Sequence, residues 1–106
     1  MVVLIVNSVI GNGSNFLSIE GLSRLKDAME EGEYVELKTE LGFEPDSEDL
    51  PYFHQYNDIA YKNQFNGHMK GAVLLSILTD HNFSIVSQGA GAGNGGWLTT
   101  WTLMRS

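Results

Sequence analysis

The run Val-Val-Leu-Ile-Val at residues 2–6 limits most strongly what this chain can fold into. These residues are aliphatic and mostly β-branched, and no polar residue alternates with them. Such a run is typical of a strand that is covered on both faces or lies at the centre of a sheet. It is far shorter than the roughly 20 residues of a membrane-spanning helix, and no basic segment precedes it as in a signal peptide. We therefore expect a cytoplasmic protein with a central first strand.

The size of the chain is that of one domain. It has 106 residues, of which 42% are hydrophobic and 18% are charged, as in folded soluble proteins. We expect a single domain over residues 1–106. The chain has no cysteine, which excludes disulfides, thiolate zinc sites and a cysteine nucleophile.

The charge is concentrated in one segment. The chain has a net charge of −7, and residues 20–49 hold eleven acidic and three basic residues, a balance of −8. This acidity argues against partners that are nucleic acids or anionic membranes, because both require a basic surface. The acidic segment is either a solvated face or a surface that meets a basic partner.

Apolar residues at every third or fourth position predict a helix over residues 19–31. The stripe consists of Ile19, Leu22, Leu25 and Met29. Ser18 is the expected N-cap, and Gly32 is expected to end the helix. A second helix is predicted over residues 68–80, with Asn82 in a left-handed conformation after its end.

Alternation of apolar and polar residues predicts the remaining strands. They are expected at residues 33–41, 52–56, 83–88 and 97–104. In the first of these, Val35, Leu37 and Leu41 are expected to share one face; in the last, Trp97, Trp101 and Leu103. Residues 11–15, 42–51, 57–67 and 89–96 are expected to be mainly loops.

The predicted order of elements is β-α-β-β-α-β-β. Its first six elements match the ferredoxin-like split pattern, with one strand added. The predicted fold is an α+β two-layer sandwich with an antiparallel sheet of about five strands and two helices, ferredoxin-like or similar.

The glycine-rich run at residues 89–96 is the most conspicuous local motif. Gly91, Gly93 and Gly96 satisfy G-x-G-x-x-G, but a dinucleotide site needs a helix after this motif. Only ten residues follow, and they predict a strand. The run is either a flexible hairpin loop or a bare backbone that a ligand or partner approaches closely.

The titratable residues form no recognisable catalytic or metal-binding motif. His54, His68 and His81 are too far apart for a short metal-ligand pair, and no G-x-S-x-G motif is present. We expect no catalytic residue, no metal and no cofactor. An enzyme that uses His54 or His81 with a nearby carboxylate remains an alternative.

Several aromatic residues are candidates for a protein contact. Alternation along the strand at 52–56 sets Tyr52 and Tyr56 opposite Phe53, so both faces of that strand need cover. We expect partner contacts at Tyr52, Tyr56, Gly89 and Trp97, because aromatic residues are enriched at interfaces. Trp101 is expected to lie in the core.

Parts of the chain resemble the GTP cyclohydrolase I feedback regulatory protein. The resemblance is carried by strand Leu4-Ile5-Val6-Asn7-Ser8, by Tyr-Phe-His-Gln-Tyr at 52–56, by the helix at 73–78, by Asn-Phe-Ser-Ile-Val-Ser at 82–87, by the G-x-G at Gly91 and Gly93, and by Trp101-Thr102-Leu103. It covers about half of the chain.

The resemblance implies a non-enzymatic homopentamer that regulates a partner enzyme and binds a small amino-acid-like or pterin-like ligand. Ile10 matches an isoleucine of that family's phenylalanine pocket. Asn94 stands where the family has a glutamine, after Gly91 and Gly93. The implied ligand-binding residues are therefore Ile10, Gly91, Gly93 and Asn94.

Two functions of different classes follow. The first is a small homo-oligomeric regulatory or ligand-binding protein that modulates a partner enzyme. The alternative is an acidic protein inhibitor, such as a phage-type antagonist, that occupies a basic site on a target enzyme.

Overall fold

The computed structural model describes residues 1–11, 14–42, 53–56, 58–64, 71–93 and 96–106. Within these residues the elements are β1 (Val2–Gly11), β2 (Ser14–Glu20), α1 (Leu22–Ala28), α2 (Glu31–Leu41), β3 (His54–Tyr56), β4 (Ile59–Gln64), α3 (Gly71–Asp80), β5 (Ser84–Gly93) and β6 (Gly96–Arg105).

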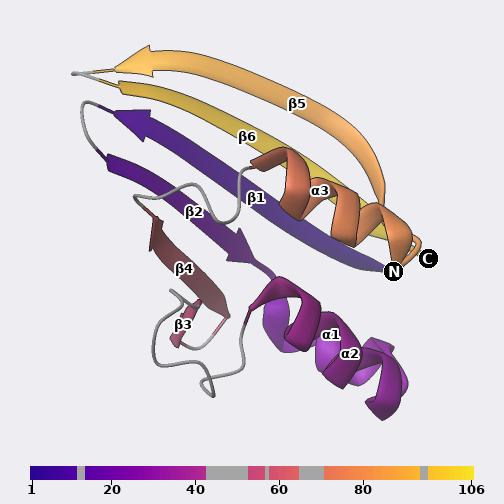
Figure 1. Cartoon of the computed structure of the whole chain (residues 1–106). Helices are drawn as coiled ribbons and strands as arrows, with labels where there is room; N and C mark the ends of the chain where they lie inside the picture. The colour runs from indigo at the N-terminus through magenta and orange to yellow at the C-terminus, as the bar shows by residue number, and fades with distance from the viewer. Residues whose placement is uncertain (12–13, 43–52, 57, 65–70, 94–95) are drawn as a thin grey trace.

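The described elements form two layers. The strands make one six-stranded sheet in the order β3-β4-β2-β1-β6-β5, and every neighbouring pair is antiparallel. The three helices lie together on one face of this sheet (Figure 1). The predicted α+β two-layer fold is therefore confirmed, as is the interior position of the first strand.

The order of the elements differs from the predicted one. The observed order is β-β-α-α-β-β-α-β-β, with one more helix and one more strand than expected. Strands β2 and β3 both pair antiparallel with β4, so they are parallel to each other with β4 between them, as in a split βαβ unit, whereas β1 and β6 lie between β2 and β5.

The core lies between the helices and the middle strands. Val2, Leu4 and Val6 point from β1 toward the helices and are buried, and Leu103 of β6 lies beside Leu4. Leu74 and Leu78 of α3 are fully buried in the same cluster. Because side chains alternate along a strand, every second side chain of β1 points toward the helices.

The predicted helix at 19–31 is shorter in the structure, and its cap is different. Ile19 and Ser18 belong to β2, and α1 begins only after Gly21. Ile19, Leu22, Leu25 and Met29 are all buried as predicted, although Ile19 reaches the core from a strand. Ser18 is not a cap, and Gly32 lies inside α2.

The predicted strand at 33–41 is wrong, because these residues form α2. Leu37 and Leu41 are buried and Tyr34 packs against the core, whereas Val35 is half exposed. Leu37 and Leu41 are four residues apart, a spacing that fits both a strand and a helix. Tyr34, three residues before Leu37, completes a helical stripe.

Strands extend into three of the segments that were expected to be mainly loops: β2 into residues 11–15, β4 into 57–67 and β5 into 89–96. β2 occupies Ser14–Glu20 and β4 occupies Ile59–Gln64. Gly11 pairs with Ser14, so the two residues between the paired ends of β1 and β2 are Asn12 and Gly13. Asn-Gly is typical of two-residue hairpin connections, and this signal could have predicted β2.

The other predicted elements are largely confirmed. β3 falls within the expected 52–56, and α3 covers the described part of the expected 68–80. Asn82 has φ 69, the left-handed conformation predicted for it. The N–H of Phe83 donates to the carbonyl of Leu78 at 3.2 Å, which closes a Schellman-type end of α3.

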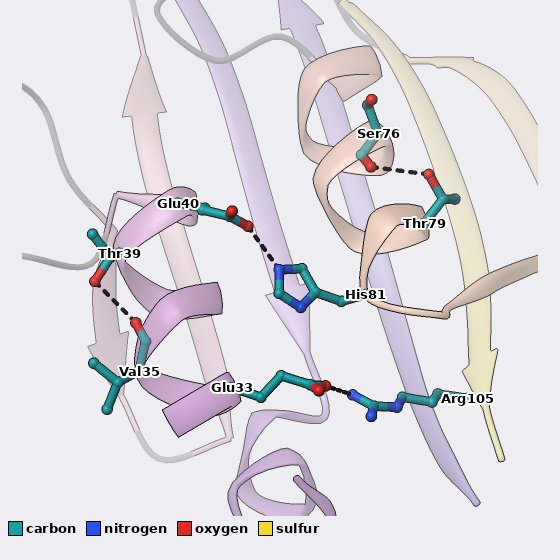
Figure 2. Close-up of polar contacts among 8 residues, drawn as sticks. All are labelled: Glu33, Val35, Thr39, Glu40, Ser76, Thr79, His81 and Arg105. Atoms are coloured by element: carbon teal, nitrogen blue, oxygen red, sulfur yellow. Dashed lines mark hydrogen bonds and ion pairs between the residues drawn. The ribbon is translucent and has the colours of Figure 1, made fainter. Parts of the chain in front are cut away.

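Two ion pairs connect α2 to other parts of the fold (Figure 2). Glu40 Oε2 lies 2.7 Å from His81 Nε2, at the end of α3. Glu33 pairs with Arg105 at the end of β6. Both contacts join residues more than 40 positions apart, so they set where α2 lies against the rest of the domain.

Candidate functional site

The hairpin end of the sheet, where β1 and β5 finish and β6 begins, carries exposed apolar side chains. Ile10 pairs with Trp97, and Trp97 pairs with Ala92 on the next strand. Ile10 lies four residues after buried Val6, so its side chain is on the helix-bearing face. Ile10 is 57% exposed and Trp97 is 50% exposed. Large apolar side chains are therefore exposed on adjacent, paired strands.

Helix α3 explains why Trp101 is covered and Trp97 is not. A Cβ added at Gly71, the first residue of α3, would lie 3.2 Å from the Trp101 ring. Trp101 packs against the buried cluster, as predicted for it. Trp97 is on the same face of β6 but four residues nearer the hairpin, beyond the start of α3.

The glycines of β5 form extended strand, which corrects the loop expected at 89–96. Gly89 pairs with Thr100, Gly91 with Leu98 and Gly93 with Gly96. A Cβ added at Gly89 or Gly91 would meet no atom within 4 Å, and neither residue has a positive φ. Neither packing nor a turn within the described chain therefore requires glycine at these two positions.

Three of the four predicted ligand-binding residues, Ile10, Gly91 and Gly93, belong to the described part of the chain. Ile10, Gly91 and Gly93 lie at the same end of the sheet, but β6 separates Ile10 on β1 from the two glycines on β5. Asn94 lies outside the described residues. Its sequence position, Asn94-Gly95 between the paired Gly93 and Gly96, matches the dipeptide typical of two-residue hairpin connections.

The predicted partner-binding set is divided by the sheet. Gly89 and Trp97 lie on neighbouring strands β5 and β6, at one side of the sheet. Tyr56 is on β3, which forms the opposite edge, with four strands between it and β5. Tyr52 lies outside the described residues. A single contact surface therefore does not join Tyr56 to Gly89 and Trp97 within one chain.

A chain of hydrogen bonds crosses the face of the sheet that has no helices. Thr100 Oγ1 donates to Asn7 Oδ1 at 2.7 Å, and Asn7 Nδ2 donates to Ser18 Oγ at 3.2 Å. Ser18 is buried although it is polar, and the bond from Asn7 satisfies it. This polar row links β6, β1 and β2 and was not predicted from the sequence.

A shallow hollow of about 280 Å³ lies at the opposite end of the same face. It is lined by Val3, Ile5, Glu20, Gly21, Arg24 and Asp58. None of these residues was predicted to belong to a site.

Asp58 has a structural role in this hollow. Its Oδ1 accepts a hydrogen bond from the N–H of Ser23 at 2.7 Å, and its carbonyl accepts from the N–H of Gly21 at 3.0 Å and of Leu22 at 3.3 Å. Hydrogen bonds from the Ser23 side chain and backbone lower the pKa of the Asp58 carboxyl below its ordinary 3.8. Asp58 thus caps α1 from 35 positions away, which no local pattern in the sequence could reveal.

His81 does lie beside a carboxylate, that of Glu40, as the alternative enzyme hypothesis requires. The pair joins two helix ends and does not line the hollow. Among the described residues, no group of three or more His, Asp or Glu side chains could hold a metal ion. None of the helices in the described part of the chain has the length and apolar character needed to cross a membrane.

Comparison with known proteins identifies the fold but no family. No protein-family model matches the chain, and no curated protein matches it. The chain is similar to the crystal structure of a conserved kinetoplastid-specific protein from Trypanosoma cruzi, with a TM-score of 0.66 and 13% identity. The similarity covers 100% of this chain and 97% of that chain. At this identity it shows a shared architecture over the full length.

Proposed function

We propose that this protein is a small non-enzymatic regulatory module that binds a partner enzyme through the hairpin end of its sheet. The observation that carries the proposal is the exposed pair Ile10 and Trp97, held on adjacent strands. Tryptophan is the residue type most enriched among binding hot spots. A side chain fixed on a sheet also loses little conformational freedom when it is bound, which favours affinity.

The class of ligand in this proposal comes from the sequence resemblance. A small amino-acid-like or pterin-like molecule would bind beside Ile10, Gly91, Gly93 and Asn94. The location of Ile10, Gly91 and Gly93 at the same end of the sheet, on either side of β6, supports this grouping. To regulate an enzyme, the ligand must bind one state of the assembly more tightly than another.

Tryptophan fluorescence tests this proposal directly, because the chain has two tryptophans. The Trp101→Phe variant leaves Trp97 as the reporter, and Trp97→Phe leaves Trp101 as the matched control. We expect GTP cyclohydrolase I, added with L-phenylalanine or tetrahydrobiopterin, to shift the emission of Trp97 and leave that of Trp101 unchanged. Equal spectra with and without these additions in the Trp97 reporter would contradict the proposal.

A second candidate function, an acidic inhibitor of a basic site, is supported by α1 and α2. The acidic side chains that are exposed on or beside these helices are Asp27, Glu30, Glu31, Glu36 and Glu40. Such a surface would attract a basic site and accelerate encounter.

Salt distinguishes the two candidates. Exposed charges are screened over about 10 Å at 0.1 M salt, so binding through the acidic helices should weaken steeply between 0.05 and about 0.5 M salt. Binding through Ile10 and Trp97 should change little over the same range. Replacing Glu30, Glu31 and Glu36 with glutamine should abolish binding through the acidic helices and leave binding through Ile10 and Trp97 unchanged.

A further inference from the structure

The two edge strands of the described sheet differ in length and in how well they are protected against pairing with another strand. One edge is β3, a strand of three residues. The other is β5, a strand of ten residues with neither a charged residue nor a proline; its register with β6 is irregular at Val86 and regular from Ser87 to Gly93. Residues 84–92 of β5 are all exposed. Native proteins usually protect a sheet edge with charges, proline, β-bulges or a short edge strand, because its unpaired N–H and C=O groups pair readily with another strand. In β5 only the irregularity at Val86 is such a device, and it leaves Ser87–Gly93 as a regular edge.

We propose that a second copy of this chain pairs with β5 in antiparallel orientation about a two-fold axis near Gly89, so that the two sheets become continuous. Main-chain hydrogen bonds between the two edges would supply the pairing, as in strand addition. Such a contact is isologous, because each copy offers the same surface to the other.

The two halves of β5 are complementary under this symmetry. The first half carries Ile85 and Val86, which are 46% and 51% exposed. The second half, Gly89–Gly93, contains only glycine and alanine. An antiparallel two-fold arrangement sets the bulky half of each copy against the bare half of the other. It also gives a reason for glycine at 89 and 91, where nothing within 4 Å demands it.

The distribution of charge favours the same contact. Each copy has a net charge of −7, so two copies repel unless their acidic regions stay apart. Arg105 is the sole charged residue in the sequence from 84 to 106. The acidic helices α1 and α2 lie on the β2 and β4 side of the sheet, away from β5 (Figure 1). Approach through β5 therefore keeps the acidic surfaces at the outer ends of the pair.

This inference goes beyond the proposed regulatory role, because it assigns to self-association a surface that does not include Ile10 or Trp97, although it shares Gly91 and Gly93 with the proposed ligand set. Sedimentation equilibrium of the full chain tests it. Val86→Lys places a charge on the edge, and Val35→Lys is the matched control on α2, since Val35 and Val86 are 52% and 51% exposed. We expect wild type and Val35→Lys to have twice the mass of one chain. Val86→Lys is expected to raise the dimer dissociation constant at least tenfold, with an unchanged circular dichroism spectrum.

Cross-linking gives a second readout that does not depend on the lysine variant. Because the chain has no cysteine, Gly89→Cys introduces one thiol near the proposed axis, and Gly32→Cys introduces one on α2. An added Cβ meets nothing within 4 Å at either position. A short bismaleimide should link Gly89→Cys into dimers and leave Gly32→Cys as single chains. A wild-type monomer, a five-fold oligomer, or equal cross-linking of both variants would overturn the proposal.

Discussion

The two ends of strand β1 have the same alternation but different surroundings. At its start, Val2, Leu4 and Val6 point toward the helices and are buried. At its other end, Ile10 points to the same side but is 57% exposed. Its neighbour Trp97 on β6 is 50% exposed. The side-chain pattern is continuous, so the difference comes from where the helices lie. The same strand thus supplies the core at one end and a candidate binding surface at the other.

The largest expected effect is a difference in the free energy of unfolding between substitutions at the two ends of β1. Leu4→Ala should lower the free energy of unfolding by about 2–5 kcal/mol, because it empties space in a fully buried cluster. Ile10→Ala removes a similar side chain from an exposed position and should cost less than about 1 kcal/mol. Urea unfolding of both variants measures the difference. Equal losses would show that the hairpin end is packed as tightly as the core.

The next effect compares two glycines. Gly21 has φ 105, and an added Cβ would lie 2.4 Å from the carbonyl oxygen of Val3. Gly21→Ala should therefore cost at least about 1–2 kcal/mol from the left-handed conformation alone, with the steric clash added.

Gly91→Ala is the matched control at the hairpin end. Its Cβ meets open space, and alanine restricts the unfolded chain, so stability should rise by about 0.5 kcal/mol. Thermal unfolding of the two variants gives both values. If Gly91→Ala were as damaging as Gly21→Ala, the β5 edge would be in close contact with other atoms, either within the chain or from the proposed second copy.

The third comparison concerns the cap that Asp58 provides for α1. Asp58→Ala removes the acceptor for the Ser23 N–H and should cost about 1 kcal/mol at pH 7, as for other helix caps. Asp58→Asn keeps an acceptor and should cost less. Because the pKa of Asp58 is lowered by folding, its contribution is present above pH 3.8 and is lost as the pH falls below that value.

Comparison of wild type and Asp58→Asn between pH 3 and 7 checks this contribution. The stability gap between them should narrow toward the acidic end of the range. A gap that stays constant with pH would exclude a contribution from the ionised carboxyl of Asp58.

Some of the fold was predictable because its signals are local. The apolar run at 2–6 is in an interior strand, and Asn82 takes the left-handed conformation, as expected from their residue types. The Asn-Gly dipeptides at 12–13 and 94–95 stand between paired strand ends and carry a local hairpin signal that could have been used.

Other parts were not predictable because two structures fit the same local pattern. Leu37 and Leu41 satisfy the period of a strand and of a helix, and only packing of Tyr34 against the core selects the helix. Of the candidate site, Ile10, Gly91 and Gly93 were named from the sequence, whereas the pairing of Ile10 with Trp97 follows from strand register.

The sequence alone therefore determined the α+β class, the central first strand, most of the buried residues and the separation of acidic from neutral segments. The tertiary structure decided that α2 is a helix, that Asp58 caps α1, and that β5 is the long edge strand of the described sheet. The physical reason is that side-chain periodicity and turn residues act within a few positions. Strand order, capping from 35 positions away and helix coverage depend on contacts between distant segments, which no local pattern encodes.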